Sequence, residues 1–142
     1  MLTFEAVKDD FTSAGIEFNE YEVDGDKVII AYMHLQKNTM EVEVVVKFSE
    51  KISICKVYMV KLAKVEPGSK QYYRTLEVCN DFNIAFHYYK MYINRDNTVW
   101  IQAALDMKKF DISEFRMTIE SILYALETDI AFINGTINFI WS

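Results

Sequence analysis

The chain has 142 residues, of which 51% are hydrophobic, 15% aromatic and 25% charged. This balance excludes disorder, because so much apolar surface offsets the chain entropy once it is buried, and the length predicts one domain over residues 1–142. The formal net charge of −6 argues against a nucleic-acid partner, since a general binder presents basic residues to phosphate.

Short elements alternate with turn signals along the first half. The predicted elements are a helix at residues 3–14 and strands at 18–23, 27–35, 41–48 and 52–65. Asp24-Gly25-Asp26 predicts a hairpin turn, because glycine and aspartate accept a positive φ. Residues 41–48 alternate apolar and charged side chains, which predicts a strand with one solvated face.

Two helices bracket a hairpin in the second half. The predicted elements are a helix at residues 70–85, strands at 87–94 and 98–106, and a helix from Ser113 to the stop signal at Asn134-Gly135. The first of these helices follows Pro67-Gly68-Ser69, and its apolar side chains recur every three or four residues. The tail 136–142 is apolar, so we expect it to pack on its own domain or on a second chain.

The element order is α-β-β-β-β-α-β-β-α. Consecutive strands joined by short turns favour an antiparallel β-meander, and packing three helices on that sheet gives an α+β fold. Two of the strands carry apolar residues on both faces. They therefore need cover on both sides, which the helices or a second subunit would provide.

The sequence shows no targeting signal. No basic segment followed by an apolar stretch opens the chain, and no apolar run is long enough to span a membrane. We therefore expect a cytoplasmic protein without a membrane partner.

The cysteines and histidines predict neither a metal site nor a cofactor. Cys55 and Cys79 are far apart, and neither forms a ligand-spaced pair with His34 or His87. We expect two packed thiols in a reducing compartment. A nucleophilic pair of Cys79 and His87 is a weaker alternative.

The catalytic motifs are absent or coincidental. Ser53-Ile54-Cys55-Lys56 fits the S-x-x-K pattern, but that motif needs a helix and here falls within a predicted strand. Asn134-Gly135-Thr136 fits the glycosylation sequon, but a helix stop explains it better. No phosphate-binding loop, nucleophile elbow or zinc-protease motif occurs, so we expect that the protein is not an enzyme.

Tyrosines are concentrated in the predicted helix at 70–85 and in the hairpin that follows it. The hairpin strand at 87–92 carries large rings on both faces, and Trp100 lies opposite it. One interpretation places these rings in the core and under a helix. The other makes them an association surface, because tyrosine and tryptophan are enriched in interfaces.

The order of elements and several local patterns resemble the YbjN-like family of small bacterial proteins, described as sensory transduction regulators. The resemblance rests on several segments of this sequence. They are Tyr21 to Asp26, the strands at 42–48 and around Val57, Val65-Glu66-Pro67, the helix end Cys79 to Asn83, and the following hairpin and closing helix. The tail after Gly135 does not match the family pattern.

The resemblance implies a fold similar to the type III secretion chaperones, a homodimer, and a non-enzymatic role in binding a protein or peptide. It also implies that Asn80 and Asn83 cap the helix end and tie the next strand. The candidate partner-binding residues are Tyr88, Tyr92, Trp100, Phe139 and Trp141.

Three functions therefore stand side by side. The first is a dimeric chaperone-like or regulatory protein-binding domain. The second is an acidic inhibitor or immunity-type protein that blocks a basic partner through charge steering. The third is a small-ligand sensor with an aromatic pocket.

Overall fold

A computed structural model describes residues 1–35, 41–86 and 88–128, and its elements confirm the α+β class. They are α1 (Phe4–Ser13), β1 (Phe18–Val23), β2 (Asp26–His34), β3 (Glu41–Ser49), β4 (Ile54–Val60), α2 (Lys70–Ala85), β5 (Tyr89–Ile93), β6 (Val99–Asp106) and α3 (Ile112–Thr128). The strands form one six-stranded antiparallel sheet in the order β1-β2-β3-β4-β6-β5. The first four strands are a meander, whereas the strand next to β4 is β6, so β5 becomes an edge.

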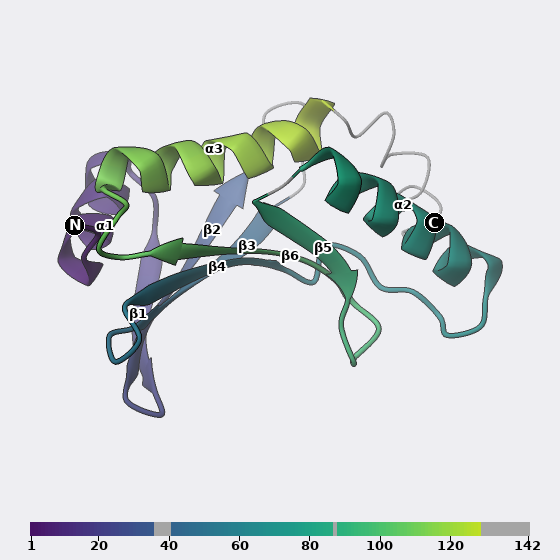
Figure 1. Ribbon diagram of the computed structural model, residues 1–142, viewed down its shortest axis with the longest axis horizontal. Helices are drawn as coiled ribbons and strands as arrows, with labels where there is room; N and C mark the ends of the chain where they lie inside the picture. Colours follow the sequence, from purple (N-terminus) through teal and green to yellow (C-terminus); the bar gives the residue numbers. More distant parts are fainter. Residues whose placement is uncertain (36–40, 87, 129–142) are drawn as a thin grey trace.

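All three described helices lie on one side of the sheet (Figure 1). The core fills the space between them, with Val44, Val57 and Ile101 fully buried from the sheet and Phe11 and Phe115 from the helices. No described helix lies over the opposite side, which we call the open face. The sequence predicts that the helices or a second subunit cover both faces of the sheet. The described helices cover one face only.

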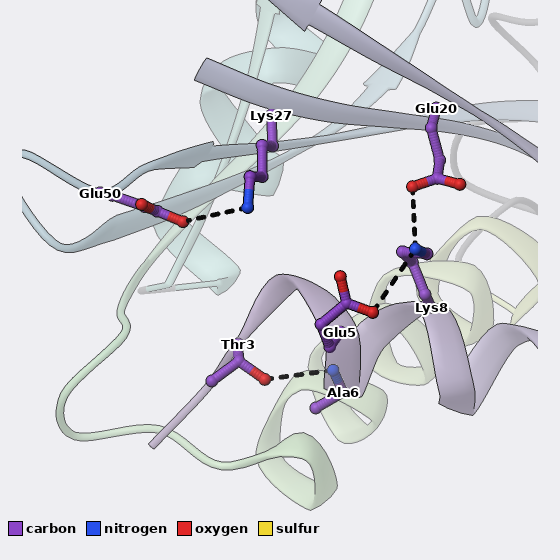
Figure 2. Close-up of polar contacts among 7 residues, drawn as sticks. All are labelled: Thr3, Glu5, Ala6, Lys8, Glu20, Lys27 and Glu50. Carbon is purple, nitrogen blue, oxygen red and sulfur yellow. Dashed lines mark hydrogen bonds and ion pairs between the residues drawn. The ribbon is translucent and has the colours of Figure 1, made fainter. Parts of the chain in front are cut away.

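Polar contacts at α1 fix it against the edge of the sheet (Figure 2). The Thr3 hydroxyl accepts a hydrogen bond from the Ala6 amide at 3.1 Å, which makes Thr3 the N-cap of α1. The ammonium group of Lys8 lies 2.9 Å from a carboxylate oxygen of Glu20 on β1 and 3.5 Å from one of Glu5. These contacts join the first helix to the first strand.

The β1–β2 turn is the predicted hairpin. Asp24 and Gly25 both have positive φ angles, 52° and 83°, and Val23 pairs with Asp26 across them. Two central residues with positive φ match the right-handed twist of the flanking strands. This turn sets which side chains of β2 reach the core.

The strand predicted at 52–65 is shorter in the structure, where β4 covers Ile54–Val60. Ser53 and Lys61 have positive φ angles of 55° and 51°, which end regular strand geometry on both sides. Leu62 lies beyond that break and is 1% exposed in the core. An uninterrupted strand would place Leu62 on the same face as Tyr58, so the break at Lys61 turns it to the core side.

The two long helices begin close to where the sequence predicts. In α2 the apolar stripe is narrower than expected: Leu76 is 42% exposed, while Thr75 is buried and donates its hydroxyl hydrogen to the Gln71 carbonyl at 2.7 Å. The predicted continuation of α3 to Asn134-Gly135, and the tail, lie outside the described residues. No helix in the described ranges combines the length and apolar character needed to cross a membrane.

Candidate binding surface

Three rings from three strands meet on the open face. The Trp100 ring centre lies 5.9 Å from that of Tyr58, in an edge-to-face arrangement, and 6.4 Å from that of Tyr92. We call Tyr58, Tyr92 and Trp100 the aromatic cluster. Two of its members, Tyr92 and Trp100, are among the predicted partner-binding residues.

Strand register explains why these rings meet. Tyr92 pairs directly with Trp100 across β5 and β6, and Tyr58 pairs with Gln102 across β4 and β6. Side chains at paired positions lie on the same face of a sheet. The core face of the same strands carries Val57 and Ile101 instead.

Hydrogen bonds hold two of the rings in place. The Tyr92 hydroxyl donates to Oε1 of Gln102 at 3.2 Å, and the Trp100 indole N–H donates to the Thr98 hydroxyl at 2.8 Å. All three rings are half-buried, so each still presents apolar surface to solvent. Partial burial raises the pKa of Tyr58 and of Tyr92, so both hydroxyls are neutral at physiological pH.

Lysines lie next to the aromatic cluster on the same face. Lys56 pairs with Lys47 on one side and with Ala104 on the other, and Lys90 pairs with Gln102. Lys47 lies 3.5 Å from an Asp26 carboxylate oxygen. Within the described ranges, neither Lys56 nor Lys90 has a carboxylate within ion-pair distance.

The remaining predicted partner-binding residues do not join the cluster. Tyr88 is 83% exposed just before β5 and contributes no ring contact among the described residues. Phe139 and Trp141 lie outside the described residues. Tyr58, which the prediction omitted, belongs to the cluster because β4 pairs with β6, a long-range pairing that no local pattern shows.

Asn83 ties the edge strand to α2. Its side-chain N–H₂ donates to the Met91 carbonyl at 3.0 Å, and its carbonyl oxygen accepts the Met91 amide hydrogen at 2.7 Å. The side chain thereby occupies the two backbone groups of Met91 that an added strand would use. Asn80 is exposed on α2, and its side chain makes no hydrogen bond within the described part of the chain.

The helices carry a second apolar surface. Exposed apolar side chains on α2 and α3 are Tyr73, Leu76, Ile84, Met117 and Tyr124. Between the end of α2 and the middle of α3 lies an open hollow of about 560 Å³, lined in part by Phe86, Met117 and Tyr124. We call the side chains around this hollow (Phe86, Met117 and Tyr124) the helix patch.

The other candidate chemistries have little support in the geometry. Burial raises the pKa of the Cys55 thiol to about 12 and that of the Cys79 thiol to about 11, so both are protonated at neutral pH. Ser53 sits in a turn outside β4, which removes the helical spacing that the S-x-x-K motif needs. In the ranges that the structure describes, no three His, Cys, Asp or Glu residues converge on a metal position. His87 lies outside these ranges.

Comparisons with protein-family models, with curated proteins and with solved structures give no match. The resemblance to the YbjN-like family therefore stays a prediction, and function has to be argued from the surfaces above.

Proposed function

We propose that this chain is a non-enzymatic protein-binding domain, of a chaperone-like or regulatory kind, whose open face contacts a polypeptide partner. The aromatic cluster carries this proposal. Partly exposed tyrosine and tryptophan rings supply large contact area with little loss of side-chain entropy, which is why such residues dominate the centres of interfaces. Their hydrogen bonds to Gln102 and Thr98 reduce that entropy cost further.

Site-specific photo-crosslinking in the native cell tests where the partner binds. A photoreactive phenylalanine analogue at position 92 lies on the open face, and the same analogue at Tyr73, which is 60% exposed on α2, serves as the matched control. We expect a discrete crosslinked protein from position 92 that is lost when Trp100→Ala is added. Equal products from both positions, or none from position 92, would contradict the proposal.

We also propose that the domain acts as a homodimer that uses the helix patch. Met117 is 64% exposed and Tyr124 is 67% exposed beside the hollow, and burying such side chains against a second copy is favourable. Light scattering at micromolar concentration should give twice the chain mass of 16.7 kDa. Met117→Glu should yield the monomer, whereas Ser113→Glu, exposed on the same helix, should not. A monomeric parent protein would contradict the dimer.

The crosslinked partner also separates the alternative functions. An inhibitor or immunity-type role predicts a basic partner attached through acidic surface rather than through position 92. A sensor role predicts that a small molecule stays bound to the purified protein in native mass spectrometry. A protein partner at the open face with no retained small molecule favours the proposed function over both.

A further inference from the structure

The open face carries several lysines, although the net charge of the molecule is negative. The chain carries 21 acidic and 15 basic residues, yet Lys47, Lys56 and Lys90 share the face with the aromatic cluster. Lys47 and Lys56 are paired directly across β3 and β4. Like charges at paired positions destabilise a sheet, and here Asp26 compensates the charge of Lys47 at 3.5 Å but leaves Lys56 without a carboxylate partner in the described ranges.

The two lysines without a carboxylate partner lie beside the rings, Lys56 two residues before Tyr58 and Lys90 two residues before Tyr92, and they pair with Ala104 and Gln102 of β6. Lys56 is on β4 and Lys90 is on the edge strand β5, with β6 between them. Because strands are about 4.8 Å apart and rise about 3.4 Å per residue, the two Cα atoms are roughly 12 Å apart. In an extended peptide, side chains four residues apart lie on one face at about that separation.

We propose that the open face binds an extended acidic peptide segment, with carboxylates four residues apart at Lys56 and Lys90 and an aromatic side chain between them beside Tyr58 and Gln102. This inference rests on the proposed function and names its ligand class. Charge complementarity supports it, since neither lysine is neutralised by a carboxylate in the described ranges.

A short acidic peptide fits this face better than single-stranded nucleic acid. A polyphosphate needs a continuous basic path, whereas Glu43 and Asp106 interrupt this face at positions paired with Tyr32 and Ile54. The net charge of −6 also repels a long polyanion, while two local lysines suffice for two carboxylates.

Fluorescence of Trp100 measures the binding. The chain has two tryptophans, Trp100 and Trp141, so the variant Trp141→Phe keeps Trp100 as its one tryptophan fluorophore. The probes are the synthetic peptide Ser-Glu-Ser-Phe-Ser-Glu-Ser, the same peptide with both Glu replaced by Gln, and a short oligothymidylate. We expect the Glu peptide to shift Trp100 emission and the Gln peptide to bind about tenfold more weakly, with affinity for the Glu peptide falling as salt rises.

A matched pair of charge reversals locates the contact. Lys56→Glu with Lys90→Glu should weaken the Glu peptide about tenfold or more, whereas Lys108→Glu with Lys109→Glu, exposed between β6 and α3, should leave affinity within about twofold. Both variants have the same net charge, so a general effect of charge cancels.

Three results would overturn the inference. The Glu and Gln peptides could bind with equal affinity, and Tyr92→Ala could weaken the binding of both. In that case the ligand is not specifically acidic, while binding at the open face stands. If oligothymidylate binds more tightly than the Glu peptide, the ligand is single-stranded nucleic acid. If no probe shifts Trp100 emission, the acidic class fails, and the crosslinking contrast between positions 92 and 73 decides the proposed function separately.

Discussion

Asn83 takes the place of a neighbouring strand for Met91. A backbone N–H and a carbonyl at a sheet edge are open to pairing with another chain, which is a common route to aggregation. Here a single amide side chain satisfies both groups, at 2.7 Å and 3.0 Å, from the last turns of α2. The same contact holds the edge strand that carries Tyr92 and Lys90.

Replacing Asn83 should therefore destabilise the fold. We expect Asn83→Ala to lower the free energy of unfolding by about 1–2 kcal/mol, because it removes both hydrogen bonds of Met91. Asn80→Ala, on an exposed position of the same helix, should change it by less than about 0.5 kcal/mol. Urea unfolding measures both, and equal losses in the two variants would contradict a specific tie to Met91.

At the scale of elements, the β1–β2 turn favours glycine at position 25 because of its backbone conformation, and not because space for a side chain is lacking. The φ angle of Gly25 is 83°, and a Cβ atom built there meets no heavy atom within 4 Å. The cost of a side chain at this position therefore comes from conformation and not from a clash.

Two substitutions separate these effects. Gly25→Ala should lower the free energy of unfolding by about 1 kcal/mol, because alanine disfavours positive φ. Gly25→Asn should recover at least half of that loss, since asparagine tolerates the left-handed region far better. Thermal unfolding of the two variants gives the comparison. Equal losses would show that the turn is insensitive to backbone preference.

Local patterns predict the elements that depend on local physics. The alternation of Val42, Val44 and Val46 predicts β3 almost to the residue, and Ser69 predicts the start of α2, where its hydroxyl accepts the Tyr72 amide hydrogen at 3.1 Å. The positive φ at Lys61 has no such signal, because lysine rarely adopts it. The sequence therefore predicts a strand that runs beyond the end of β4 at Val60.

At the scale of the whole molecule, one-sided cover decides which rings are exposed. The rings on the hairpin strand point to both faces, so sequence alone leaves core and surface interpretations open. The structure places Met91 under the helices and Tyr92 on the open face. Tyr58 and the lysines join Tyr92 only through pairings between strands far apart in the chain, so the candidate site could be predicted only in part.

Thiol and phenol groups that are shielded from solvent also make the stability of the whole fold sensitive to alkaline pH. Cys55, Cys79, Tyr58 and Tyr92 all have a raised pKa, and desolvation is the first cause for each. For the two thiols, the pKa rises from the ordinary 9.0 to about 12 and about 11. Between these values the unfolded chain releases protons that the folded chain keeps, so stability is full below pH 9 and falls as pH rises.

The free energy of unfolding should therefore decrease from pH 9 toward pH 11, by about 1.4 kcal/mol per pH unit for each thiol that ionises only when unfolded. Urea unfolding at several pH values measures this slope under reducing conditions. The double variant Cys55→Ala with Cys79→Ala starts from lower stability, because it leaves cavities, but should show a shallower slope. A slope that is unchanged in the double variant would assign the alkaline sensitivity to other groups, and a flat profile in the parent protein would mean that the thiols are accessible to solvent in the folded state.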